Sequence, residues 1–188
     1  MARAKIFVIS APSGCGKTTL CRRLLGDQLG LVGSVSMTTR RPRPGEINGI
    51  DYHFVPEKHF RKMAKAGQFL EYEENFGHLY GTPKKFISDN LKKGINVLLS
   101  IDVKGATKVR KAYRSRSVLV FILPPSVAAL KKRLVARMSD NSETIATRLA
   151  NARRELSYKG RYDYRIINDR LDRAYKRLKA IVRSEINR

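Results

Sequence analysis

FVISAPSGCGKTTL, residues 7–20, decides the fold of this chain. A phosphate-binding loop follows the pattern G-x-x-x-x-G-K-[ST], and here Ala11 stands where the first glycine belongs. Pro12 follows it, and a residue before proline is pushed into an extended backbone that alanine adopts without strain. Gly14 and Gly16 remain where backbone amides must come close to phosphate oxygens. The stretch therefore predicts an intact phosphate cradle.

The flanking residues support this prediction. The apolar run at 4–10 is typical of a buried parallel strand, and KTTLCRRLL at 17–25 is typical of a helix. Strand, glycine loop and helix are the context that the motif requires; the alternative is a glycine-rich turn with an incidental lysine. We expect Lys17 to reach the β- and γ-phosphates and Thr18 to coordinate Mg²⁺. The residues expected to surround the nucleotide phosphates are Ala11, Pro12, Ser13, Gly14, Cys15, Gly16, Lys17 and Thr18.

Beyond the loop, strands and helices alternate. INVLLSI (95–101) and SVLVFIL (117–123) are predicted strands of the same sheet, and Leu171, Tyr175, Leu178 and Val182 share one helix face. This alternation predicts a three-layer α/β fold with a parallel core sheet. Residues 36–94 interrupt it with short strand-like and helix-like stretches, which indicates a small inserted α+β lobe. ARMSDNSET (136–144) is either a lid or an ordinary loop between basic helices.

Composition limits the class of protein. The chain has 188 residues and a formal charge of +23, from 39 Lys and Arg against 16 Asp and Glu. One domain is expected, and the charge favours polyanionic ligands without selecting among them. Cys15 and Cys21 suggest no disulfide or metal site. With no signal peptide and no apolar run of about 18 residues, we expect a cytoplasmic protein that does not enter a membrane; a homo-oligomer is left open.

The segment SVSMTTRRPRPGEINGIDYHF (34–54) narrows the prediction. Together with the phosphate loop it resembles guanylate kinase, a P-loop nucleoside monophosphate kinase that transfers the γ-phosphoryl group of ATP to GMP. The resemblance continues through FLEYEENFGHLYGT (69–82), SIDVKGA (100–106), FILPPSVAALKKRL (121–134) and RIINDRLDRAYKRL (165–178). It implies a single domain over 1–188, with a core of 1–35 and 95–188, a GMP-binding lobe of 36–94 and a basic lid of 136–148.

The resemblance also implies roles for individual residues. The GMP phosphate would be held by Arg40, Arg43, Tyr52 and Tyr80, and the guanine edge by Ser36, Glu71 and Thr82. Asp102 would lie beside the reacting phosphates and the acceptor, and Asn168 near the adenine of ATP. The residues expected to act on the transferring phosphoryl group are Lys17, Arg40, Arg133, Arg137 and Arg148, with Asp102. The implied cofactor is Mg²⁺ with ATP, and the implied acceptors are GMP and dGMP.

These residue types suit the chemistry. A GMP phosphate oxygen is already anionic near neutral pH, so no strong base is needed and catalysis depends on alignment and charge neutralisation. Arginine binds two phosphate oxygens with its planar fork and keeps its charge. Blander roles remain open: Thr82 precedes Pro83 and would cap the next helix, Tyr52 and Tyr80 would be core aromatics, and the lid arginines and Glu71 would be surface residues. We also expect the loop amides and Lys17 to lower the pKa of the Cys15 thiol.

Three positions depart from the family pattern, namely Ser100, Lys104 and Arg170. They affect the surroundings of Asp102 and of the adenine site and leave the loop and the GMP clamp intact. Related domains also serve as non-catalytic interaction modules, but those have a degraded loop, whereas Lys17, Thr18, Arg40 and Arg43 are present here. Nucleic-acid binding is expected to be non-specific at most, since no RNA-binding motif is seen. A related small kinase with another acceptor is disfavoured by Glu71.

Overall fold

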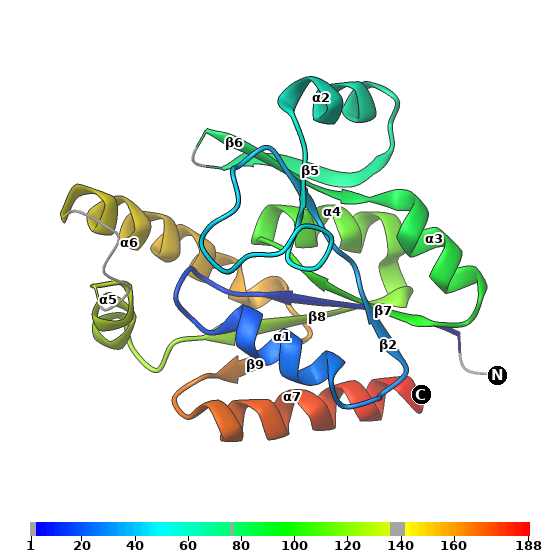
Figure 1. The fold of residues 1–188 in the computed structure, drawn as a ribbon. Helices are drawn as coiled ribbons and strands as arrows, with labels where there is room; N and C mark the ends of the chain where they lie inside the picture. Colours follow the sequence, from blue (N-terminus) through cyan, green and yellow to red (C-terminus); the bar gives the residue numbers. More distant parts are fainter. Residues whose placement is uncertain (1–2, 76, 136–141) are drawn as a thin grey trace.

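A parallel five-stranded sheet forms the centre of the protein (Figure 1). The computed structural model describes residues 3–75, 77–135 and 142–188. The strand order is β2-β7-β1-β8-β9, and every neighbouring pair is parallel. The strands are β2 (Leu31–Gly33), β7 (Asn96–Ser100), β1 (Ile6–Ser10), β8 (Ser117–Leu123) and β9 (Tyr164–Ile167).

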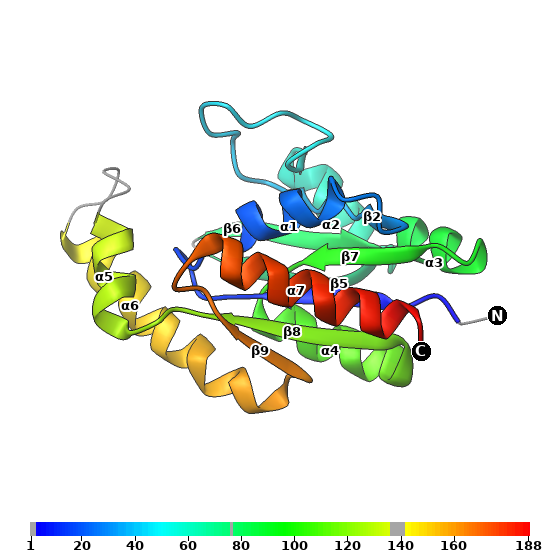
Figure 2. The same cartoon turned by 90° about the horizontal axis from the view of Figure 1, so that it is seen from below.

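Helices cover both faces of this sheet, as Figure 2 shows from below. Side chains alternate between the two faces of a strand, so Phe7 and Ile9 of β1 pack in one apolar cluster and Ile6 and Val8 in the other. The first cluster includes α1 (Lys17–Leu25) and α7 (Leu171–Ile186), and the second α3 (Lys84–Lys92) and α4 (Val103–Tyr113). The predicted three-layer α/β fold is confirmed.

A second, smaller sheet lies between β2 and α3 in the chain. Its order is β4-β3-β6-β5, with β4 (His53–Phe54), β3 (Met37–Thr38), β6 (His78–Pro83) and β5 (Phe69–Asn75). Helix α2 (Glu57–Lys65) covers it. Phe60 of α2 stacks on Phe69 with ring centroids 4.4 Å apart, and both pack with Leu79 in an apolar cluster separate from the two of the main sheet. This sheet therefore has its own core.

Two further helices, α5 (Val127–Val135) and α6 (Ser142–Ser157), stand near the end of the main sheet where β1 leads into α1. Short 3₁₀ turns at Arg114–Arg116 and Tyr158–Arg161 precede β8 and β9. Part of the expected lid, Arg137 included, lies outside the described residues. In the part of the chain that is described, no helix has the length and apolar character needed to cross a membrane.

The strands predicted at 95–101 and 117–123 are confirmed as β7 and β8. Among the strand-like stretches expected within 36–94, residues 49–55 (GIDYHFV) contribute only the two residues of β4, because tight turns occupy the first half. Gly49 has a φ of 81° and donates its N–H to Tyr52 O at 2.8 Å. Strands β6 and β9 were not predicted. HLYGTP mixes glycine, proline and polar residues, and the four residues YRII are short beside a strongly helical neighbour.

Candidate functional site

The phosphate loop joins β1 to α1 at the carboxyl edge of the main sheet. Gly14 and Gly16 take positive φ values of 85° and 80°, the left-handed region that glycine tolerates best. Ala11 is buried and is not among the positive-φ residues of the described chain. The prediction that alanine suffices at the first loop position is therefore confirmed.

Asn168 holds this loop from behind. It follows β9, and its side-chain amide donates to Cys15 O at 2.8 Å. A methyl group on Gly16 would lie 2.6 Å from that amide nitrogen, so the close packing of Asn168 against the loop requires glycine at position 16. The backbone O of Asn168 in turn accepts from Arg133 Nη2 at 2.9 Å. Asn168 thus orders the loop, and its expected contact with adenine stays a prediction.

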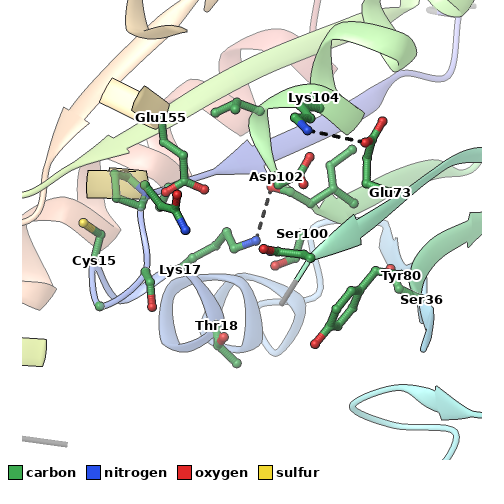
Figure 3. Close-up of a pocket in the computed structure, with 18 of the residues that line it drawn as sticks. Cys15, Lys17, Thr18, Ser36, Glu73, Tyr80, Ser100, Asp102, Lys104 and Glu155 are labelled. Carbon is green, nitrogen blue, oxygen red and sulfur yellow. Dashed lines mark hydrogen bonds and ion pairs between the residues drawn. The ribbon is translucent and has the colours of Figure 1, made fainter. Parts of the chain in front are cut away.

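Lys17, the first residue of α1, is turned into the interior. Its Nζ donates to Ile101 O at 3.2 Å, beyond the end of β7 (Figure 3). Burial lowers the pKa of Lys17, while nearby anionic groups, including Asp102, oppose the shift. The ammonium is therefore held beside the loop by weak partners, and an anionic ligand would be a stronger one.

A cavity of about 500 Å³ opens between the loop, the second sheet and α6. Its size matches the range of small-molecule sites. Most residues expected from the sequence meet here although they are distant in the chain: the whole loop Ala11–Thr18, Ser36, Arg43, Tyr52, Glu71, Tyr80, Asp102 and Arg148. Arg40, Thr82, Arg133 and Asn168 are not in this lining, and Arg137 lies outside the described residues.

Glu71 of β5 is the unusual group in the cavity. Glu71 is only 7% exposed, and its carboxylate forms no ion pair with any described residue. The Thr82 hydroxyl of β6 donates to Oε1, and Oε2 faces Gly105, where an added methyl group would lie 2.8 Å away. Burial raises the pKa of Glu71 to about 7, and the Thr82 hydrogen bond only partly offsets this. A carboxylate is thus kept with spare acceptor capacity.

Thr82 and Asp102 complete the surroundings of Glu71. Because Pro83 occupies the N-cap of α3 without a side-chain cap and the Thr82 hydroxyl is committed to Glu71, the capping role considered for Thr82 is wrong. Asp102 caps a different helix, α4, where its Oδ1 accepts from Gly105 N at 2.8 Å. The carboxylate of Asp102 is thereby fixed at the end of β7, close to Lys17.

Four of the expected phosphate-binding residues, with Ser36, line a second cavity of about 280 Å³ that adjoins the first: Arg40, Arg43, Tyr52 and Tyr80. The Tyr52 and Tyr80 rings meet edge to face, with centroids 6.0 Å apart. Arg40 lies 5.6 Å from the centre of the Tyr52 ring. Arginine and tyrosine donors around a hollow suit an anion of the size of a phosphate group. The same lining contains Glu46 and Asp51, which pair with Arg40 and Arg22.

The comparisons with known proteins agree with this geometry. A family model described as "Guanylate kinase" matches residues 3–185. The chain belongs to the guanylate kinase family. It is therefore an enzyme of the nucleoside monophosphate kinase class.

Individual relatives show how far the likeness extends. The guanylate kinase of Wolbachia pipientis wMel is 51% identical over 180 residues, which cover 96% of this chain and 90% of the relative. That of a Wolbachia from Brugia malayi is 50% identical over 96% and 92%. The crystal structure of guanylate kinase from Anaplasma phagocytophilum has a TM-score of 0.85 at 36% identity, covering 100% of this chain and 88% of that one.

The departures from the family pattern have visible partners. Lys104 lies 3.7 Å from Glu73, which Lys108 also contacts at 2.5 Å, so both lysines of α4 face β5. Ser100 lines the larger cavity. Arg170 occupies the N-cap of α7, and its backbone N–H donates to Asp169. Of these three departures, only Ser100 and Lys104 border the larger cavity.

Glu155 of α6 is a residue of the site that no sequence motif indicates. It lines the larger cavity, and Figure 3 shows it reaching from α6 toward Lys17. Burial raises the pKa of Glu155 to about 7, whereas Lys17 and a hydrogen bond to the Ser13 backbone lower it. In the sequence it stands among arginines, polar residues and leucines of a helix, and no motif distinguishes it from a surface glutamate.

The expected activation of Cys15 is wrong. Its side chain points away from the cavity into the apolar cluster with Leu130 and Leu134, and it is fully buried. Burial raises the pKa of Cys15 to about 12, and Arg133 only partly opposes this. Cys21 is likewise buried, with a pKa raised to about 11.

We therefore predict that a thiol reagent reacts with the native protein at least about a hundredfold more slowly than with the unfolded protein, because the thiolate is the reactive form. Timed labelling followed by mass spectrometry of intact protein measures both rates. Rapid modification of Cys15 in folded protein would contradict the burial argument.

Glu71→Gln is expected to stabilise the fold at pH 8. Between pH 4.5 and about 7 the folded carboxyl binds more protons than the unfolded one, so its contribution to stability declines as pH rises through that window. Glutamine has no such dependence. The variant should gain about 2 kcal/mol in free energy of unfolding at pH 8 relative to pH 5, each measured against wild type by urea denaturation.

Glu57→Gln is the matched control, because Glu57 is an exposed partner of Arg61 in α2. Its free energy of unfolding should follow the wild-type pH profile. If Glu71→Gln did so too, the raised pKa of Glu71 would be disproved.

Proposed function

We propose that the protein transfers the γ-phosphoryl group of ATP to GMP or dGMP, forming ADP and GDP or dGDP. The observation that carries the proposal is Glu71, a buried carboxylate that forms no ion pair within the described part of the chain, in the same cavity as an intact phosphate loop. The loop supplies the donor site, and the carboxylate supplies a recognition group for a base that presents two adjacent donors.

Guanine is that base. Its ring N1–H and exocyclic amino group lie side by side, and one carboxylate accepts from both in a charge-assisted pair. Adenine presents a lone pair at N1, which would face the carboxylate and leave it unpaired. The Ser36 hydroxyl borders both cavities and would donate to guanine O6. Thr82 would keep Glu71 oriented.

The acceptor phosphate would occupy the smaller cavity, between Arg40, Arg43, Tyr52 and Tyr80. Lys17 and the loop amides would hold the donor phosphates, and Arg148 would approach from α6. Catalysis would then consist of alignment in line and neutralisation of charge on the phosphoryl oxygens. Arg133, which is not in the lining of the larger cavity, would join only if α5 moves toward the nucleotides. Arg137 would act with it.

Mg²⁺ fits the residues present. The Thr18 hydroxyl lies at the cavity edge of the loop, and the described residues contain no cluster of three His, Cys, Asp or Glu that could hold a metal by itself. The ion would therefore be held by Thr18 and by phosphate oxygens, as in other phosphate-loop enzymes. When bound, it would offset the negative charge of the phosphate oxygens.

The test is ADP release with GMP, dGMP, AMP, UMP and CMP as acceptors. We expect kcat/KM for GMP and dGMP to exceed that for AMP by roughly 10⁴-fold, because AMP leaves a buried carboxylate unpaired. Glu71→Gln should lower kcat/KM for GMP by about a hundredfold and leave KM for ATP within about twofold. Lys17→Ala, which keeps the base site, should lose kcat with every acceptor. Comparable wild-type efficiency with AMP and GMP would refute the proposal.

A further inference from the structure

Glu46 lies in the loop between β3 and β4, directly after Gly45, whose φ of 81° turns the chain back on itself. Both oxygens of its carboxylate accept from Arg40 Nη2, at 2.9 and 3.0 Å. Oε2 also accepts from the backbone N–H of Arg43 at 2.7 Å. One carboxylate thus holds the side chain of one arginine and the main chain of the other.

Arg40 is largely enclosed at this point. Its side chain is 11% exposed, and that of Glu46 is 20% exposed. Nη1 donates to Arg41 O at 2.6 Å, and the guanidinium lies 5.6 and 5.7 Å from the centres of the Tyr52 and Phe54 rings. Nε is buried and has no hydrogen-bond partner among the described residues. A guanidinium keeps its charge when buried, so it needs a counter-ion, and Glu46 provides it.

The contacts of Glu46 distinguish it from an occupant of the phosphate site. If it merely filled that site, it would engage the side chains of both arginines. Glu46 also lines the smaller cavity, but it binds the side chain of Arg40 and the main chain at Arg43, while Arg43 itself lines both cavities. The pairing fixes where the Arg40 head lies and how the turn at 43–46 is closed.

We propose that Glu46 is a positioning residue for the acceptor phosphate: it holds Arg40 and the backbone of Arg43 in the geometry that binds this phosphate, without touching it. The inference rests on the proposed function, in which the smaller cavity receives the phosphate of GMP. Substitution of Glu46 should then weaken ligands that carry the phosphate and spare ligands that lack it.

The experiment compares binding of GMP and of guanosine by titration calorimetry in wild type and Glu46→Gln. We expect Kd for GMP to rise about tenfold, as for loss of a hydrogen-bonded charge partner, and Kd for guanosine to stay within about twofold. Glu46→Asp, which keeps the charge with a shorter reach, should recover part of the loss. Glu57→Gln removes an exposed ion pair of α2 and should change neither Kd.

A double substitution tests whether Glu46 acts through the clamp. On an Arg40→Ala background, Glu46→Gln should raise Kd for GMP by less than about threefold, because most of what it positions is gone. A full tenfold effect on that background would overturn the proposal, as would an unchanged Kd in the single variant. Tighter GMP binding by Glu46→Gln would show competition with the phosphate and overturn it too.

The control arms separate this inference from the proposed function. If wild type failed to use GMP as acceptor, the function itself would be wrong. If wild type used GMP and Glu46→Gln weakened guanosine and GMP equally, only the positioning role would fail, because the variant would have altered the lobe as a whole. Intact guanosine binding in Glu46→Gln also reports that the variant has folded.

Discussion

A carboxylate buried at the junction of the two sheets is the constraint around which the site is built. Burying Glu71 with a single hydroxyl partner costs free energy, and that cost appears as a pKa raised to about 7. The neighbouring elements fit closely around it. Strand β6 supplies Thr82, and α4 must have glycine at position 105, since any larger side chain would meet the carboxylate. A ligand with two donors would repay the cost, which links the position of the small sheet to the choice of base.

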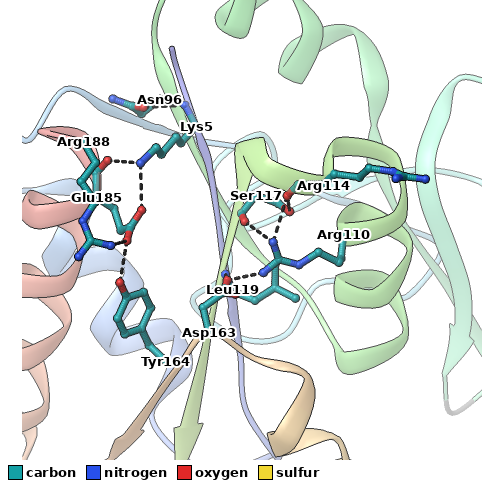
Figure 4. A network of polar contacts seen from close by, with 10 residues as sticks. All are labelled: Lys5, Asn96, Arg110, Arg114, Ser117, Leu119, Asp163, Tyr164, Glu185 and Arg188. Carbon is teal, nitrogen blue, oxygen red and sulfur yellow. Dashed lines mark hydrogen bonds and ion pairs between the residues drawn. The ribbon is translucent and has the colours of Figure 1, made fainter. Parts of the chain in front are cut away.

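Acidic residues are scarce in this chain, with 16 Asp and Glu against 39 Lys and Arg. Some of them therefore each bind more than one partner. Glu185 accepts from Lys5 at 2.9 Å, from the Tyr164 hydroxyl at 2.6 Å and from Arg188 at 2.8 Å, joining the start of the chain to its last helix (Figure 4). Asp163 accepts from Arg110 and from the backbone of Leu119. The residues of these networks are absent from the lining of the larger cavity, which carries cations such as Lys17, Arg43 and Arg148 together with acidic residues. Glu185 and Asp163 thus stabilise the scaffold, whereas other acidic residues, among them Glu71, Asp102 and Glu155, lie beside the cations of the cavity.

The sequence predicted the main architecture because its signals are local. A glycine loop between strand and helix, and apolar runs such as 117–123, depend on short-range physics and are confirmed as the phosphate loop and β8. Burial by distant segments could not be predicted in the same way. We expected Cys15 to be activated beside Lys17, yet it is buried in the apolar cluster that includes Leu130 and Leu134 of α5. Glu155 resembles a surface residue in the sequence, and it lines the cavity only because α6 lies beside the phosphate loop. The pairing of Thr82 with Glu71 depends on strand register, which Pro83 concealed by suggesting a helix cap.

The most direct test of this account is the pH dependence of GMP binding. Only the ionised Glu71 accepts from both guanine donors. Its pKa is about 7, so at lower pH the Glu71 carboxyl must release a proton when GMP binds. Kd for GMP should therefore rise up to about tenfold per pH unit as pH falls below 7 in wild type. The GMP phosphate also titrates near pH 6, and Glu71→Gln retains that titration alone. Calorimetry from pH 5.5 to 8.5 on both proteins isolates the difference. We expect the wild-type profile to be steeper by one proton; parallel profiles would contradict the central role assigned to Glu71.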